Sequence, residues 1–262
     1  MRKKIISLVI LFELLACVGF SQTNAALPSS SIALSPLTGC KQVLLVTTAD
    51  WPVVTGTMRR FVRTNAESSW IQVGESIPVV VGRNGLGWGR GLNAVPNPAM
   101  PAKHEGDGKS PAGIFRLSSA FGLLSVDKVA PLKLPYEYLT NGIECVDDVK
   151  SAHYNSIVDR AQTQPVDWNS SEKMNTVAQY RLGVVVEHNT DPREPGGGSC
   201  IFIHTWAGPQ TGTSGCTAMA SENIDTVVPW LDPADAPVLV QLPEAAYRRW
   251  RVEWELPQIT KF

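Results

Sequence analysis

Short runs of β-branched residues recur through most of the chain, and glycine or proline bounds many of them. Such runs are typical of β-strands, because branched side chains pack well on a pleated sheet whereas glycine and proline favour turns. The pattern therefore predicts a mainly β fold with a few short helices. The predicted strands cover residues 42–48, 69–74, 77–82, 180–189, 199–206, 237–242 and 250–256.

Turn signals in the first half of the chain predict two further features. Glu75 and Ser76 separate the strands 69–74 and 77–82, and we expect a hairpin there. The stretch 82–92 is too rich in glycine for a regular element and predicts a loop. No strand-to-helix unit surrounds it, so it is not a dinucleotide-binding fingerprint.

Helical signals are sparse. Residues 147–161 show only a weak helical spacing. Residues 221–232 predict a helix with Ser221 as its N-cap and acidic residues near its positive end. We expect Pro229 to kink or shorten this helix, because proline lacks the amide hydrogen that the helical ladder uses.

The N-terminus has the composition of an export signal. Positive residues precede a short apolar run that Glu13 interrupts, whereas a membrane-spanning helix needs a longer apolar run. We therefore assign 1–25 to a signal peptide, 26–40 to a Pro/Ser-rich tether and 41–262 to one folded domain. Cys17 follows Leu-Leu-Ala, which resembles a bacterial lipobox. Cys17 is thus either a lipid anchor or a small residue within the signal peptide.

Export would place the mature chain in the periplasm or elsewhere in the cell envelope. Loss of residues 1–25 removes three positive charges and one negative charge, which changes the net charge from -1 to -3. This balance lacks the basic footprint of a nucleic-acid-binding protein. We expect no nucleic-acid partner, and membrane contact only through a lipid on Cys17.

Four cysteines remain after the signal peptide, namely Cys40, Cys145, Cys200 and Cys216. In an oxidising compartment paired cysteines tend to form disulfides. Four cysteines allow three complete pairings, and composition does not choose among them.

One histidine and one cysteine stand close together in the sequence. His204 ends the apolar strand CIFIH, and Cys216 follows a Gly-rich loop just before the predicted helix. A cysteine is a useful nucleophile only with a base nearby, and His204 would supply it. The amides of Ser214, Gly215 and Cys216 would then face the group under attack.

Two other fates for Cys216 remain open at this point. In the first, Cys216 forms a disulfide, as most exported cysteines do. Alternatively it would join Cys200, His204 and His188 as a zinc ligand, although the short Cys-x-x-Cys clip of structural zinc sites is missing. We expect no metal and no cofactor.

The stretch IFIHTWAGPQTGTSGCTAM resembles the catalytic signature of the L,D-transpeptidase family, which has a His, a variable loop, Ser or Thr, a variable residue, Gly and Cys. Upstream, KHEGDGKSPAGIF (103–115) is similar to the family's Lys/Thr-Pro-x-Gly-x-Phe segment. The similarity covers roughly residues 42–243. It implies that 41–262 is a single catalytic domain of the YkuD type, a mainly β sandwich.

The resemblance implies a role for each matching residue. Cys216 corresponds to the nucleophile and His204 to the histidine that activates it. The backbone carbonyl of Thr205 would orient the imidazole, and the amides of Ser214 and Gly215 would stabilise the oxyanion. The implied reaction is attack of Cys216 on the peptide bond between residues three and four of a peptidoglycan stem, which forms a thioester.

The fate of that thioester separates three hypotheses. Transfer to an amine makes the protein a transpeptidase that forms crosslinks or attaches molecules to the wall, and transfer to water makes it an L,D-carboxypeptidase. The third hypothesis is a noncatalytic domain that binds the cell wall. The resemblance also implies that carbapenem-type β-lactams acylate Cys216.

The sequence departs from the family pattern at two positions. Ser214 stands where many members have His, and Ala218 stands where many have the Arg or Asn that holds substrate. Arg90 and Arg83 in the Gly-rich loop are candidates to replace that residue, or are simply solvated. Further candidates for the substrate groove are Trp88, Trp206 and His188. His188 is alternatively a histidine on the surface at a strand end.

In the exported setting we favour a disulfide between Cys145 and Cys200. It would attach the segment around Cys145 to the strand that carries His204. Cys40 would then stay free or pair between molecules. A Cys200–Cys216 disulfide would instead remove the nucleophile.

Overall fold

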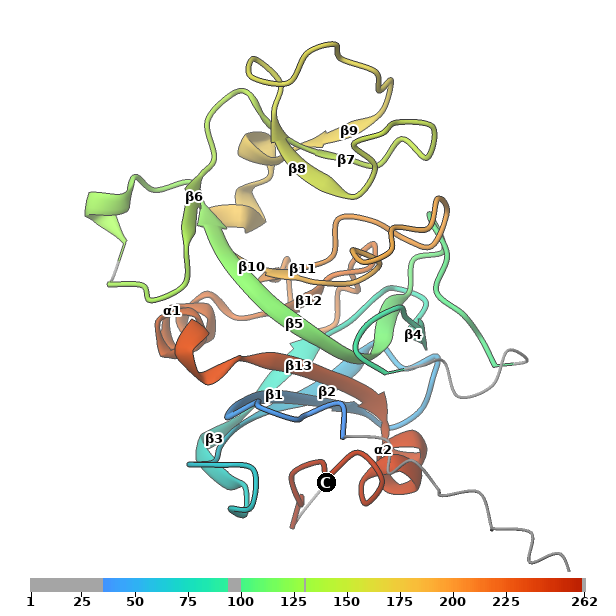
Figure 1. Cartoon of the computed structure of the whole chain (residues 1–262), viewed down its shortest axis with the longest axis vertical. Coiled ribbons are helices and arrows are strands. Elements are labelled where there is room, and N and C mark those ends of the chain that lie inside the picture. Colours follow the sequence, from blue (N-terminus) through green and yellow to red (C-terminus); the bar gives the residue numbers. More distant parts are fainter. Residues whose placement is uncertain (1–34, 94–99, 130, 261–262) are drawn as a thin grey trace, which may run out of the picture. The chain divides into compact units, whose positions relative to one another are not determined.

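The computed structural model describes residues 35–93, 100–129 and 131–260 (Figure 1). The description concerns the unit formed by residues 34–262. The predicted signal peptide and the candidate lipid anchor at Cys17 lie outside the described residues. Within these ranges, no helix has the length and apolar character needed to cross a membrane.

Eight strands of the main sheet form a closed ring, because β5 pairs with both β13 and β10. Most neighbours are antiparallel, whereas β1 and β13, and β11 and β12, run parallel. In ring order the strands are β10 (Leu182–Val186), β11 (Phe202–Thr205), β12 (Thr217–Met219), β3 (Ile71–Val80), β2 (Thr55–Val62), β1 (Gln42–Thr48), β13 (Val238–Pro243) and β5 (Ser110–Gly122). Two short strands, β4 (Leu86–Trp88) and β6 (Tyr136–Tyr138), pair with β5.

A second, smaller sheet consists of β7 (Ile143–Val146) between β8 (Ser156–Asp159) and β9 (Ser171–Lys173). Figure 1 shows it at the top of the view, beyond β6 and separate from the main sheet. In the described part of the chain, the helices are α1 (Ser221–Trp230), α2 (Glu244–Trp250) and four 3-10 turns, at Val126–Lys128, Met174–Thr176, Ala178–Arg181 and Pro233–Asp235.

The position of β1 in the core explains why its central residues form a continuous apolar run. All seven residues of β1 are buried, and Val43, Leu44, Leu45 and Val46 are fully inaccessible. A strand covered on both faces does not alternate between apolar and polar residues. The mainly β fold predicted from the sequence is confirmed, and the predicted strand 42–48 coincides with β1.

Other predicted elements are correct in type but differ in their ends. The predicted strands 180–189, 199–206 and 237–242 contain or overlap β10, β11 and β13. The predicted helix begins at Ser221, but its N-cap is Ala220. It ends at Trp230, before the predicted end at residue 232, and Pro229 lies inside its last turn.

Four local predictions were wrong. No hairpin forms at Glu75 and Ser76, because 71–80 is one long strand. The register between β2 and β3 shifts between the pairs Met58–Ile77 and Arg60–Val73, and Gly74, at a φ of 68°, lies in the part of β3 that carries the extra residues. The expected loop 82–92 contains β4. The weakly helical 147–161 forms turns and β8. The expected strand 250–256 is the end of α2 followed by a turn.

The folded unit includes the end of the predicted tether. Leu37 and Cys40 are 0% and 6% exposed and lie in the hydrophobic core. Arg63 donates hydrogen bonds to the carbonyl oxygens of both residues, at 2.6 Å for Leu37 and 2.7 Å for Cys40. Residues 35–40, predicted to belong to the tether, therefore pack with the folded unit.

Candidate active site

The pairing of β11 with β12 brings His204 and Cys216 to one side of the sheet. The two strands are parallel, with His204 opposite Ala218. Side chains alternate along a strand, so Cys216, two residues before Ala218, shares the face of His204. Both residues line the same cavity, and each is 8% exposed.

The Cys216 thiol is free and buried. It donates a hydrogen bond to the carbonyl oxygen of Cys200, with an S···O distance of 3.6 Å. Burial, followed by the negative charge of Glu172, raises the pKa of Cys216 to about 12, although hydrogen bonds from the Phe202 backbone and from Tyr180 act in the opposite direction. The resting group is therefore a neutral thiol.

The imidazole of His204 is held by the next residue in the chain. Its Nδ1 lies 2.7 Å from the carbonyl oxygen of Thr205, and a carbonyl only accepts, so Nδ1 carries the hydrogen and donates it. Nε2 remains as the nitrogen that can accept a proton. Burial lowers the pKa of His204 below its ordinary value, so this ring is neutral at neutral pH.

The loop before Cys216 is fixed by hydroxyl groups. Thr213 Oγ1 donates to the carbonyl oxygen of Cys216 at 2.5 Å and accepts from the amide of Gly215 at 3.1 Å. Ser110 Oγ also donates to the Cys216 carbonyl, at 2.9 Å. Ser110 begins the SPAGIF segment on β5, so the two sequence motifs meet at the backbone of the candidate nucleophile. The Gly215 amide is engaged by Thr213 in this state.

A cavity of about 550 Å³ opens over the thiol. Arg83 lies in its wall and donates from Nη1 to Ser214 Oγ at 3.1 Å. Residues from five regions of the chain line the cavity: Arg83; Lys103, Glu105 and Gly106; Asp147; Glu172, Val177, Gln179 and Tyr180; and Ser199, Cys200, Ile201, His204, Ala207 and 211–216.

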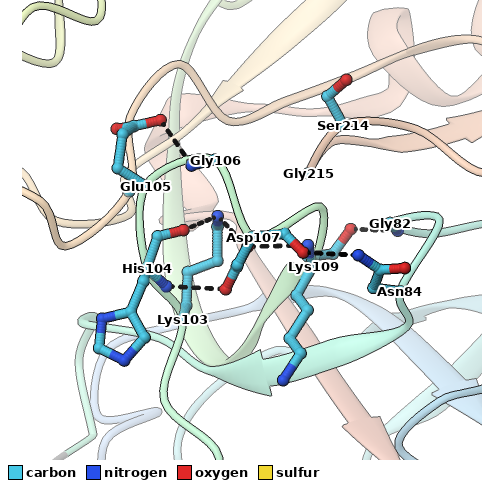
Figure 2. A network of polar contacts seen from close by, with 12 residues as sticks. Gly82, Asn84, Lys103, His104, Glu105, Gly106, Asp107, Lys109, Ser214 and Gly215 are labelled. Carbon is cyan, nitrogen blue, oxygen red and sulfur yellow. Dashed lines mark hydrogen bonds and ion pairs between the residues drawn. The ribbon is translucent and has the colours of Figure 1, made fainter.

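A polar network fixes one wall of the cavity below the nucleophile loop. Figure 2 shows the Lys103 ammonium between the Asp107 carboxylate and the carbonyl oxygen of His104, at 2.6 Å from each. The hydrogen bond to Lys103 and those from the His104 and Lys109 amides lower the pKa of Asp107. The charge of Lys103 is thus balanced within the wall, and the turn from 103 to 109 is held rigidly.

The small sheet reaches the cavity through a disulfide. Cys145 on β7 is bonded to Cys200, with Cα atoms 6.0 Å apart. This is the pairing favoured from the sequence, and it leaves Cys216 free. Cys40 is also free, but it is buried in the core, which is unsuited to pairing between molecules.

Tyr180 and Glu172 form a contact that sequence reasoning missed. The Tyr180 hydroxyl donates to Glu172 Oε2 at 2.8 Å, and the Tyr180 ring packs edge-on against the His204 ring at 5.2 Å between centroids. Tyr180 precedes β10 and Glu172 lies on β9, far from both motifs in the sequence. No local pattern marks either residue, because only the tertiary fold brings them together.

Four residues predicted for the substrate groove lie outside the cavity lining. Trp88 is 1% exposed and packs against Trp51 and Trp254, because β4 turns its ring into the core. Trp206 and Arg90 do not line the cavity either. Of the two arginines considered, Arg83 is the one in the wall.

The fourth of these, His188, is neither a groove residue nor a surface residue. It is 1% exposed; its Nδ1 accepts from the Arg90 amide at 3.2 Å, and its Nε2 lies 3.0 Å from the carbonyl oxygen of Gly197. The antiparallel pairing places Val184 opposite Ile203, so the register does not bring His188 to His204. Desolvation lowers the pKa of His188 to about 4.

The zinc hypothesis does not fit this arrangement. The sulfur of Cys200 is bonded to Cys145, and the His188 ring is hydrogen bonded to the carbonyl oxygen of Gly197. In the described part of the chain, no group of three or more His, Cys, Asp or Glu residues is arranged to hold a metal ion.

Comparison with known families supports the family resemblance seen in the sequence. The model of the L,D-transpeptidase catalytic domain, YkuD, matches residues 47–240, which is more than half of the chain. The chain therefore belongs to the L,D-transpeptidase catalytic domain family. No curated protein and no solved structure gave a match.

Proposed function

We propose that the protein is an exported cysteine L,D-transpeptidase that acts on peptidoglycan stem peptides. The observation that carries the proposal is the buried, unpaired thiol of Cys216, which shares a 550 Å³ cavity with an imidazole whose Nδ1 is held by the Thr205 carbonyl. The family acts on peptidoglycan, which implies a location outside the cytoplasm. The predicted signal peptide agrees with that location.

The acylation step follows from the neutral state of both groups. As the Cys216 sulfur attacks the carbonyl carbon of the stem peptide bond, Nε2 of His204 takes the thiol proton. Backbone amides at Ser214 and Cys216 stabilise the oxyanion. The C–N bond then breaks, His204 returns the proton to the departing amine, and the acyl group remains on sulfur as a thioester.

In the second step an acceptor amine attacks the thioester. His204 takes a proton from the attacking amine, the C–S bond breaks, and the sulfur recovers a proton as a thiol. Water in place of the amine gives L,D-carboxypeptidase action with the same groups. The noncatalytic alternative has less support, because His204 and Cys216 both line the cavity.

Arg83 is the residue that we propose for holding the donor carboxylate. Ala218 is fully buried in β12 and offers no polar group to substrate. Arg83 is exposed, lies in the cavity wall and is already directed to Ser214, two residues before the nucleophile. A guanidinium binds a carboxylate through two parallel hydrogen bonds, which suits the free carboxylate of a terminal D-residue.

The test uses the purified mature protein with muropeptides, analysed by mass spectrometry beside Cys216→Ala. Loss of a terminal D-residue together with a new crosslink supports transpeptidation, and loss without a crosslink supports the carboxypeptidase. Identical products from Cys216→Ala would remove Cys216 from the mechanism. Labelling of Cys216 by a carbapenem-type β-lactam is the matching expectation, and absence of that label would count against a productive site.

A further inference from the structure

We propose that Glu105 is a specificity-determining residue, which binds an ammonium group on the side chain of the third residue of the donor stem. The site would then favour stems with a diamino acid at that position over stems with a neutral residue there. The inference rests on the proposed function, because it takes the peptide bond after the third residue to be the bond that Cys216 attacks.

The Glu105 carboxylate is fixed in the cavity wall by two buried hydroxyl groups. Its Oε2 accepts a hydrogen bond from Tyr154 at 2.6 Å and another from Ser199 at 2.7 Å. Tyr154 and Ser199 are 3% and 7% exposed and come from distant segments of the chain. The Tyr154 oxygen accepts from the Gly198 amide at 3.2 Å, so the single phenolic hydrogen is directed to Glu105. Glu105 is therefore held in one orientation before a ligand arrives.

The second carboxylate oxygen of Glu105 can still accept a hydrogen bond from a ligand. Oε1 accepts from the Gly106 amide at 3.3 Å, and a carboxylate oxygen has room for two such bonds (Figure 2). Glu105 is half-buried and lines the cavity. By contrast, Glu172 accepts from Tyr180, and one oxygen of Asp147 is inaccessible to solvent. Of the carboxylates in the described lining, Glu105 is thus the best placed to meet a ligand.

The charges of the cavity lining favour a cation. The described residues of the lining include three acidic and two basic ones, namely Glu105, Asp147 and Glu172, and Arg83 and Lys103. The Lys103 ammonium is already paired with Asp107 at 2.6 Å. An excess of one charge in a cavity attracts ligand groups of the opposite charge, and an ammonium forms a charge-assisted hydrogen bond with a carboxylate. An apolar side chain would instead cover Oε1 of Glu105 and leave it without a donor, which is unfavourable.

Glu105 and Arg83 approach the candidate nucleophile through different segments. Arg83 donates to Ser214, two residues before Cys216. The Cys216 thiol donates to the carbonyl oxygen of Cys200, and the residue before Cys200 donates to Glu105. In Figure 2 Glu105 and Ser214 lie on opposite sides of the view. A stem with its terminal carboxylate at Arg83 and its scissile bond at Cys216 would therefore extend its third residue towards Glu105.

The experiment compares two stem tetrapeptides that differ only at the third residue, which is lysine in one and norleucine in the other. Norleucine has a straight apolar side chain without the ammonium of lysine. The measurement is kcat/KM for release of the terminal D-residue by the mature protein. We expect the wild-type protein to prefer the lysine peptide about tenfold, which is the effect of one hydrogen bond to a charged group. Glu105→Gln keeps an acceptor for Tyr154 and Ser199 but removes the charge, and it should abolish most of this preference.

The control is Glu137→Gln, which removes an exposed carboxylate on β6 outside the cavity lining and should keep the wild-type preference. Equal kcat/KM for the two peptides in the wild-type protein would overturn the proposal. A loss in Glu105→Gln that is as large on the norleucine peptide as on the lysine peptide would also overturn it, because that result indicates a structural role.

Binding of the tripeptide products supplies a measurement without turnover. Calorimetry on the wild-type mature protein should give about a tenfold lower Kd for the lysine tripeptide than for the norleucine tripeptide. Equal Kd values would overturn the proposal, and this result decides the matter if Glu105→Gln does not fold. No bond is broken, so the outcome does not depend on Cys216 as the nucleophile. Selective binding of the lysine tripeptide without release of a D-residue from the tetrapeptide would support the Glu105 site and contradict the proposed function alone.

Discussion

The strands β11 and β12 and the small sheet β7–β9 meet at one cavity but bring different chemistry to it. β11 carries His204 and β12 follows Cys216 within a closed sheet, where pairing on both sides of each strand fixes their places. The small sheet has a covalent link to this region through Cys145 and Cys200. The difference indicates a division of roles: the main sheet supplies the reacting groups, and the attached sheet contributes Glu172 to the cavity wall beside them.

Removing a reacting group should have the largest effect. We expect Cys216→Ala and His204→Ala each to lower kcat/KM by about 10³-fold or more, because they delete the nucleophile and its base. The measurement is the release of the terminal D-residue from a purified stem peptide. Cys40→Ala is the matched control, since it removes the other free thiol from a site in the core. Activity retained in Cys216→Ala would contradict the assignment of roles to the main sheet.

Cutting the link between the sheets should have an intermediate effect. In the double variant Cys145→Ser, Cys200→Ser we expect the free energy of unfolding to fall by about 2–4 kcal/mol, because the disulfide closes a segment of 55 residues. Activity should fall about tenfold while the main sheet stays folded, because Glu172 on β9 loses its fixed place in the cavity wall and its hydrogen bond to Tyr180, which packs against His204. Urea unfolding and turnover on the same samples test both points. Wild-type turnover in the double variant would show that the small sheet does not influence the site.

His188 tests the stability of the main sheet rather than its chemistry. Its pKa is lowered to about 4 in the folded state, below the ordinary 6.5 of an unfolded histidine. The folded state thus binds fewer protons than the unfolded state between these values, so stability is complete above pH 6.5 and declines as the pH falls towards 4. We expect a loss of about 3 kcal/mol from this residue. Urea unfolding near pH 7 and pH 4 should show a smaller pH dependence for His188→Gln, and an equal dependence would be inconsistent with the buried neutral ring.

Arg83 should show the smallest effect, on substrate binding alone. We expect Arg83→Gln to raise KM for a stem peptide about tenfold and to leave kcat nearly unchanged, because the carboxylate contact lies away from the reacting bond. Arg90→Gln is the matched control, since Arg90 belongs to the same loop region but does not line the cavity. A larger rise in KM in Arg90→Gln than in Arg83→Gln would show that Arg90, and not Arg83, holds the carboxylate.

The main sheet was easier to predict from the sequence than the small sheet. His204 and Cys216 lie 12 positions apart in a stretch with a recognisable order, and β1 is a continuous apolar run, so both are visible locally. The alternation of apolar and charged residues in 250–256 was misleading. Trp254 and Leu256 pack on the core from a turn after α2, and a turn with two buried residues two positions apart resembles a strand.

The parts that sequence reasoning missed depend on contacts between distant segments. Glu172 reaches the cavity only because β9 pairs with β7 and β7 is bonded to Cys200. Trp88, in the Gly-rich stretch 82–92, was a candidate for the groove, but the parallel pairing of β4 with β5 directs its ring inwards. Register and the path of the disulfide determine these positions, and neither leaves a local pattern.

The most direct test of the account is to trap the acyl-enzyme. Intact mass spectrometry of the mature protein, quenched with acid during turnover of a stem peptide, should show one added acyl group, and peptide mapping should place it on Cys216. The adduct should be absent from Cys216→Ala. Product formation without an adduct on Cys216, or with the acyl group on another residue, would contradict the central claim that this buried thiol is the nucleophile.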